Sequence, residues 1–159
     1  MTSMIDLSSP DEPVIVIRRT FDAPRELVWE AITDPKHVAQ WYGGAGFTNP
    51  VCEMDLRPGG AWRQVMQAPS GAQFAINSIF EEVVPPARLV WRTPKDPKRD
   101  PAPPGSLNTI TLEASGAQTK WMLVARFDGI AERDLTASLG FGQMIGMGLE
   151  RLADHLKTL

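Results

Sequence analysis

Few side chains in this sequence are spaced for catalysis. The two histidines, His37 and His155, and the single cysteine, Cys52, are the first places to look for a base, a nucleophile or a metal ligand. No carboxylate or nucleophile is spaced to join His37, so we expect its ring to pack on a short surface helix. His155 falls in the last turn of a predicted helix, where it would cap the helix end, and we place the two histidines at opposite ends of the fold.

Motifs that carry known chemistry are absent from the sequence. It contains no Walker loop, no Gly-x-Gly-x-x-Gly, no Gly-x-Ser-x-Gly and no His-Glu-x-x-His. Cys52 has no partner at metal-ligand spacing. The sequence therefore predicts no catalytic residue, no metal site and no cofactor.

A stretch near the C-terminus is rich in glycine and methionine. Four glycines fall within nine residues there, and each costs a helix about 1 kcal/mol relative to alanine. They indicate either close packing against neighbouring elements or space for a ligand, and the sequence leaves both open. Methionine adapts to varied apolar shapes, and Gln143 is the polar group best placed to orient a bound molecule. The glycines are Gly140, Gly142, Gly146 and Gly148.

Several predicted strands carry large apolar side chains on alternate positions, as in Trp62, Gln64 and Met66. Such a face is typical of a core and equally of an apolar pocket with a few polar anchors. Arg63, Arg92 and Arg126 alternate with apolar residues and are expected to point outward, whereas an inward arginine would imply an anionic ligand. The candidate ligand-binding residues are Trp41, Trp62, Gln64, Met66, Trp91, Trp121, Phe141, Gln143 and Met144, with Trp29 as a weaker candidate.

These residues must be positioned by a β-α-α-β-β-β-β-β-β-α chain. Pro24 and Pro35 suit first helical turns, and Gly43 and Gly44 end the second helix. Runs of strands between helices favour an α+β fold with an antiparallel sheet curved around the last helix, with a cavity between them. The predicted strands are 14–21, 47–55, 61–67, 73–84 (with a bulge), 88–93, 107–113 and 119–128, and the predicted helices begin at 24 and 35 and span 132–157.

Composition is that of one ordinary globular domain. The chain has 159 residues, 43% of them hydrophobic, and a net charge of −3. Without a cluster of basic residues we expect no nucleic-acid partner, and without a long apolar run we expect no membrane span. Residues 1–13 are interpreted as a flexible leader without signal-peptide features, followed by a single domain over 14–159, and the lone cysteine fits a cytoplasmic location. The proline-rich segment 94–105 is either a solvated loop or a lid.

Several blocks of the sequence together resemble a known family. The resemblance spans about residues 14–157 and indicates the SRPBCC (START-like) superfamily, in the branch named after the C-terminal domain of the activator of heat-shock protein 90 ATPase. The blocks are the segments 21–29, 33–35, 40–43, 47–48, 53–62, 84–90 and 148–153.

This resemblance implies a helix-grip fold: a curved antiparallel sheet of six to seven strands wrapped around a long C-terminal helix, with two short helices after the first strand. It also implies a hydrophobic cavity, because superfamily members bind lipids, sterols, hormones or polyketides. The branch has no general catalytic signature to carry over. This chain has Gly142-Gln143-Met144 where the branch often has Gly-Trp, and it lacks the extra N-terminal domain of eukaryotic chaperone activators, so chaperone activation is not inherited from the name.

Three functions follow, in this order. The first is binding of a small hydrophobic molecule between the sheet and the last helix. The second is protein interaction, as a chaperone partner or through self-association by Trp41-Tyr42 or the last helix. The third is a cyclase or dehydratase activity, for which the available groups are Glu53, Asp55, His37 and Arg63.

Overall fold

A computed structural model describes residues 4–6, 11–98 and 102–159. Within these residues the element order is β-β-α-α followed by six strands and two helices. The elements are β1 (Met4–Asp6), β2 (Val14–Phe21), α1 (Arg25–Thr33), α2 (Pro35–Trp41), β3 (Thr48–Met54), β4 (Ala61–Gln67), β5 (Gln73–Val84), β6 (Arg88–Thr93), β7 (Ser106–Ser115), β8 (Gln118–Arg126), α3 (Ile130–Ser138) and α4 (Phe141–Leu156).

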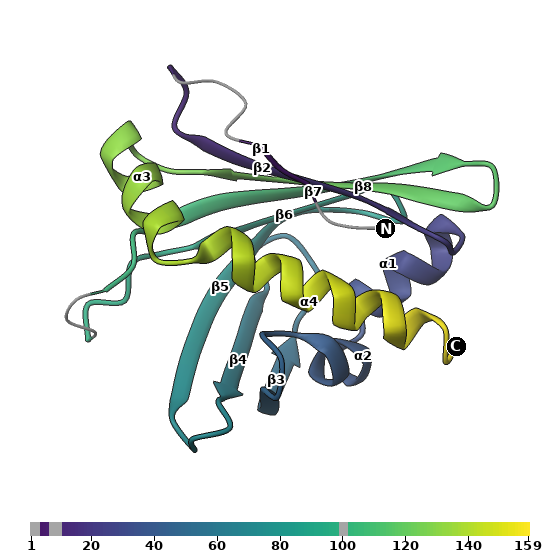
Figure 1. The fold of residues 1–159 in the computed structure, drawn as a ribbon, viewed down its shortest axis with the longest axis horizontal. Helices are drawn as coiled ribbons and strands as arrows, with labels where there is room; N and C mark the ends of the chain where they lie inside the picture. The colour runs from purple at the N-terminus through teal and green to yellow at the C-terminus, as the bar shows by residue number, and fades with distance from the viewer. Residues whose placement is uncertain (1–3, 7–10, 99–101) are drawn as a thin grey trace.

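All described strands join one antiparallel sheet in the order β1-β2-β8-β7-β6-β5-β4-β3. The sheet curves around α4, which lies on its concave side together with α1 and α2 (Figure 1). The predicted α+β architecture is thus confirmed, because seven strands form where the alternating patterns place them. The bulge predicted in β5 is also present, between Phe80 and Glu82.

The structure adds a strand that the sequence did not predict. β1 pairs with β2 through Met4 and Arg18, within the segment expected to be a leader. Residues 1–3 and 7–10 of that leader lie outside the described residues, so the leader stays a prediction. The 94–105 segment connects β6 to β7 and is described except for 99–101. Its role as a lid also stays a prediction.

The predicted single helix over 132–157 is two helices. Gly140 has φ +88°, a left-handed conformation that suits glycine and ends α3 before α4 begins. In a continuous helix, Leu135 and Leu139 would share one apolar face with Leu149 and Leu156 because they recur at steps of three and four. With the break, they are 49% and 65% exposed. On α4, the positions Gly142, Leu149 and Leu156 of that face are buried.

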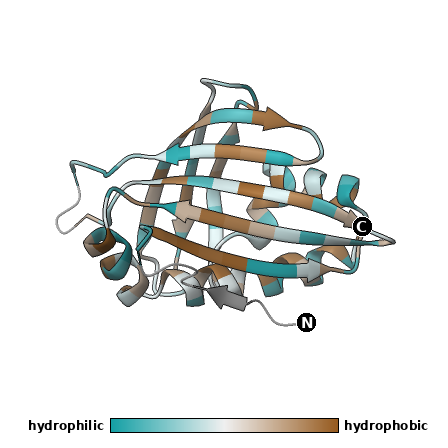
Figure 2. Ribbon diagram, turned by 90° about the horizontal axis from the view of Figure 1, so that it is seen from above, coloured by the Kyte–Doolittle hydropathy of each residue, from teal (hydrophilic) through white to brown (hydrophobic). Residues whose placement is uncertain are grey.

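The core lies between the concave face of the sheet and the helices. Figure 2 shows the helices gathered on one side of the sheet, with hydropathy alternating along several strands. Arg63, Arg92 and Arg126 are exposed, as predicted for outward positions. Arg63 pairs with Glu53 at 3.6 Å, and Arg92 pairs with Glu81 at 3.0 Å.

α4 is attached to the segment after α2 by one side chain. The guanidinium of Arg151 donates to the backbone carbonyls of Tyr42 and Gly44 at 3.0 Å and Gly43 at 3.3 Å. It also donates to the carbonyls of Gln40 and Phe47 at 3.1 Å. A planar fork of donors suits such a set of acceptors. The predicted second helix therefore ends in a loop that folds around Arg151.

Candidate ligand-binding site

The predicted tryptophans of the middle strands meet on the concave face. Trp62 stacks on Phe80 with ring centroids 5.8 Å apart, and it meets Trp91 edge-on at 5.3 Å. Tyr42, from the end of α2, approaches Trp62 edge-on at 5.8 Å. All these strand side chains are at most 9% exposed. This cluster covers β4, β5 and β6 with aromatic surface, which favours packing against apolar groups.

A polar network lies beside these rings. The amide oxygen of Gln64 accepts from Trp62 Nε1 at 2.8 Å, and Gln64 Nε2 donates to Asn49 Oδ1 at 2.8 Å. Asn49 in turn donates to the carbonyls of Ala39 and Tyr42 at 3.1 and 3.0 Å. Asn49 therefore joins α2 to β3, and Gln64 joins β3 to β4. No pattern in the sequence singles out Asn49.

Two protonatable groups next to this network remain neutral at neutral pH. Burial, followed by the nearby Cys52, raises the pKa of Tyr42 to about 12. Burial, followed by Asp34, raises the pKa of Cys52 to about 11. A thiol with so high a pKa is a poor nucleophile.

Two further predicted site residues lie at the edge of the Trp62 cluster. Trp41 donates from Nε1 to the carbonyl of Ala31 at 2.9 Å and thereby joins α1 to α2. Met66 is 7% exposed and lies against Gly43, where an added Cβ would be 3.3 Å from its sulfur. Trp41 and Met66 therefore border the α2 end of the Trp62 cluster.

Trp121, Phe141, Gln143 and Met144 do not join that cluster. Trp121 packs edge-on against Phe21 at 6.5 Å, towards the other edge of the sheet. Phe141 is half-buried against Phe127 at 6.4 Å, and Gln143 and Met144 are exposed. The predicted ligand-binding residues thus form a central group with outliers, and their role stays a prediction.

Sequence reasoning missed the inward arginine. Arg19 lies on β2 directly opposite Trp121 on β8, and its side chain is 5% exposed. Its guanidinium lies 5.3 Å from the centre of the Phe21 ring and contacts the carboxylate of Glu150 on α4. The alternation of side chains along the strand could have predicted this inward position, because Arg19 shares the face of Ile15 and Ile17.

The two histidines are neighbours, which corrects the expectation that they lie at opposite ends. His37 Nδ1 is 2.9 Å from His155 Nε2, because α4 runs back past α2. Burial, followed by His37, lowers the pKa of His155. His155 is therefore neutral at neutral pH. The sequence suggested that it caps the helix end as a cation, and this expectation is wrong.

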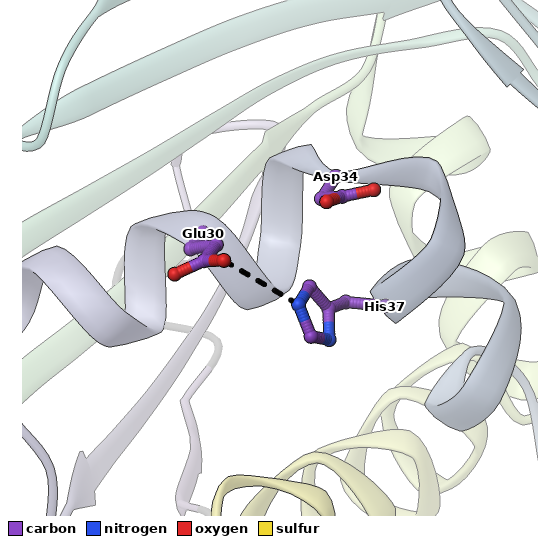
Figure 3. A group of neighbouring side chains, drawn as sticks. All are labelled: Glu30, Asp34 and His37. Carbon is purple, nitrogen blue, oxygen red and sulfur yellow. Dashed lines mark ion pairs between the residues drawn. The ribbon is translucent and has the colours of Figure 1, made fainter. Parts of the chain in front are cut away.

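Figure 3 shows His37 beside Glu30, with Asp34 near them. Glu30 Oε1 is 3.6 Å from His37 Nε2, and one ligand atom from each of the three residues lies within 4.8 Å of the others. Such a set offers donors to a divalent cation. Asp34 already caps α2 by accepting from Lys36 N at 2.9 Å. The prediction that no metal binds stays a prediction.

The groups considered for catalysis are mostly at the surface. The side chains of Glu53 and Arg63 are each 63% exposed, and that of Asp55 is 52% exposed and pairs with Arg57 at 2.8 Å. None of these three therefore lies in the apolar interior, where a perturbed acid or base would be expected.

An antiparallel sheet wrapped around a long C-terminal helix, with an apolar concave face, defines the START-like helix-grip class. Within this class the chain belongs to the family described as "Activator of Hsp90 ATPase homolog 1-like protein", whose model matches residues 22–159. No curated protein matches the chain. In the described residues no helix is both long and apolar enough to cross a membrane.

Solved structures share this fold. A protein from Nitrosomonas europaea is 28% identical, with a TM-score of 0.84 over 96% of this chain and 97% of its own. A protein from Chromobacterium violaceum is also 28% identical, with a TM-score of 0.75 over 91% of this chain and 96% of its own. A 23% identical protein from Rhodobacter sphaeroides superimposes over the whole of both chains with a TM-score of 0.88.

Proposed function

We propose that the protein binds a small hydrophobic molecule between the concave face of the sheet and α4. The observation that carries this proposal is the aromatic surface of the concave face, where Trp62, Trp91 and Trp121 each come from a different strand. Apolar and aromatic linings with few polar groups are typical of small-molecule sites.

One glycine of the helix that covers this face has no close neighbour where a side chain would begin. A Cβ built on Gly146 would meet no heavy atom of the described residues within 4 Å. Alanine would serve the helix better at such a position by about 1 kcal/mol. Glycine there leaves a ligand free to lie along α4, which supports the ligand-space interpretation of this residue.

Tryptophan emission provides a test, since the chain has five tryptophans. Titration with a neutral apolar dye such as Nile red should quench the emission saturably, with one dye per chain. Replacing Trp91 or Trp121 by Phe should reduce the quenching more than Trp29→Phe does, because Trp29 lies on α1 and is the weaker candidate. Linear quenching without saturation would contradict the proposal.

Protein interaction is a second candidate, favoured by exposed apolar side chains at the junction of α3 and α4. Leu139 is 65% exposed, and Met144 and Met147 are 38% and 43% exposed. Surface groups of this kind often mark protein contacts when they form one patch. The name of the matched family suggests a chaperone as partner. Stimulation of Hsp90 ATPase activity that is lost in Leu139→Ser would support this role. Catalysis ranks last.

A further inference from the structure

A buried arginine marks one end of the proposed ligand site. Arg19 lies on the concave face, among the apolar side chains of β2, and its side chain is 5% exposed. A buried guanidinium is costly unless charged and polar partners surround it. Arg19 therefore requires an explanation that apolar packing does not supply.

The described residues satisfy this arginine only in part. Its Nη1 contacts Glu150, but its Nε is buried without a hydrogen-bond partner among the described residues. The indole Nε1 of Trp121 is equally buried and unpartnered. Arg19 and Trp121 are register partners on adjacent strands, so their side chains stand next to each other on one face. Two neighbouring residues of this face thus each carry a buried, unpartnered N–H donor, although nearly all buried donors in proteins are paired.

The carboxylate that contacts Arg19 is not fixed in place. The side chain of Glu150 is 55% exposed, so this carboxylate itself loses little by returning to water, provided that another anion takes its place on the buried Arg19. The hydrogen bond from Arg19 lowers the pKa of Glu150, which keeps this carboxyl ionised. Glu150 therefore behaves as a removable anion at the entrance to a buried cation.

Open space adjoins this pair. Gly146 lies one turn before Glu150 on the same side of α4, and a Cβ there would meet no heavy atom of the described residues within 4 Å. On the opposite side of the helix, a Cβ on Gly148 would lie 3.5 Å from the carbonyl oxygen of Gly43. The room beside α4 is thus on the side of Arg19.

We propose that Arg19 and Trp121 bind the carboxylate of an elongated apolar acid. Without the ligand, the carboxylate of Glu150 pairs with Arg19, and the ligand displaces it. This inference rests on the proposed function, and it names the class of ligand. Two oxygens of one carboxylate match the two neighbouring donors, and an ionised acceptor strengthens both bonds. One guanidinium balances one negative charge, so a monoanion fits this site better than a phosphate dianion. The apolar chain of the acid would extend over the tryptophans of the sheet.

The test compares decanoate with 1-decanol, which share a chain and differ in the head group. Each is titrated against the full chain at pH 7, with displacement of Nile red as the readout. Decanoate should bind about 10-fold more tightly, as expected for one charge-assisted hydrogen-bonded pair. In Arg19→Met the two affinities should become equal through loss of decanoate binding, with decanol unchanged. Trp121→Phe should lower decanoate affinity by a smaller factor.

Glu150→Gln provides the opposite change. Removing the competing carboxylate should raise the affinity for decanoate several-fold and leave decanol unaffected. Asp154→Asn is the matched control, because Asp154 lies on the same helix with its side chain 79% exposed. It removes the same charge away from Arg19, so it should change neither affinity.

Failure of this inference is distinct from failure of the proposed function. If neither compound displaces the dye, hydrophobic binding itself is wrong. If decanoate binds no more tightly than 1-decanol, both to the unmodified chain and to Glu150→Gln, the anion site is wrong. Arg19 and Glu150 then only fasten α4 to β2. Thermal unfolding of each variant monitors folding. If Arg19→Met does not fold, the Glu150→Gln titration alone decides the question.

Discussion

The two sides of α4 are attached to the rest of the protein in different ways. On the α2 side, Arg151 donates to five backbone carbonyls between Gln40 and Phe47. On the β2 side, the adjacent residue Glu150 makes one contact with Arg19, beside the open position at Gly146. Two adjacent residues of one helix thus attach it differently, Arg151 through several hydrogen bonds and Glu150 through one ion pair. We therefore expect α4 to separate from the sheet more readily on the β2 side.

The physical reason lies in the partners. The acceptors of Arg151 are carbonyls at the end of α2 and in the irregular segment that follows it, and they would lose these hydrogen bonds together if the side chain left. Partial burial lowers the pKa of the Arg151 guanidinium. Glu150, with a side chain 55% exposed, can exchange its partner for water where a ligand anion replaces it on the buried Arg19. Ligand entry on the β2 side would therefore leave the α2 side intact.

The largest expected effect tests this difference directly. Arg151→Met should lower the free energy of unfolding by about 3 kcal/mol, because several carbonyls lose a charged donor. Arg19→Met should cost only about 1 kcal/mol, because the charge left behind on Glu150 faces solvent and the new side chain is apolar. Urea unfolding of both variants measures the two losses. Lys157→Met is the control, since Lys157 is 79% exposed and pairs only with Asp154 at 3.7 Å within the described residues. Equal losses for the two arginines would contradict the comparison.

A second prediction concerns the open position on the β2 side. Gly146→Ala should raise the free energy of unfolding by about 1 kcal/mol, through helix propensity alone. Gly140→Ala is the contrasting variant, because φ +88° there strains any L side chain, and it should lose about 1 kcal/mol or more. Thermal unfolding of the pair checks both signs. A loss of stability in Gly146→Ala would mean that the space beside α4 is occupied.

The sequence predicts the sheet far better than the contacts on the helix. Period-two patterns and turn residues place seven strands, because each strand carries its own signal. The sequence did not predict the break at Gly140, because four glycines lie within nine residues and nothing in the sequence distinguishes them. Only the backbone shows which of them adopts a left-handed conformation. A local pattern cannot distinguish one glycine that ends a helix from others that lie inside it.

Local patterns also limit how much of the candidate site could be predicted: they place side chains on a strand face but not contacts between distant elements. Trp62 and Trp91 come together because their positions on the strands fix their face. The approach of His37 to His155, and of Arg19 to Glu150, joins residues more than 100 positions apart. Such pairs depend on where α4 crosses the sheet, which no local spacing encodes. Arg19 alone had a local signal, since it continues the inward positions of β2.

The smallest expected effect distinguishes the two sides of α4 by pH. His155 lies one turn after Arg151, on the α2 side, and its pKa is lowered from the ordinary 6.5 by burial and by His37. The unfolded chain therefore takes up a proton below pH 6.5 that the folded chain does not, so stability is full above 6.5 and falls as the pH drops towards the lowered value. The Glu150 pKa is lowered from 4.5, so the β2 side loses stability only below pH 4.5. Urea unfolding between pH 7 and 5 should show a decline that disappears in His155→Gln and persists in Glu150→Gln. A decline that persists in His155→Gln would assign the acid sensitivity to another part of the molecule.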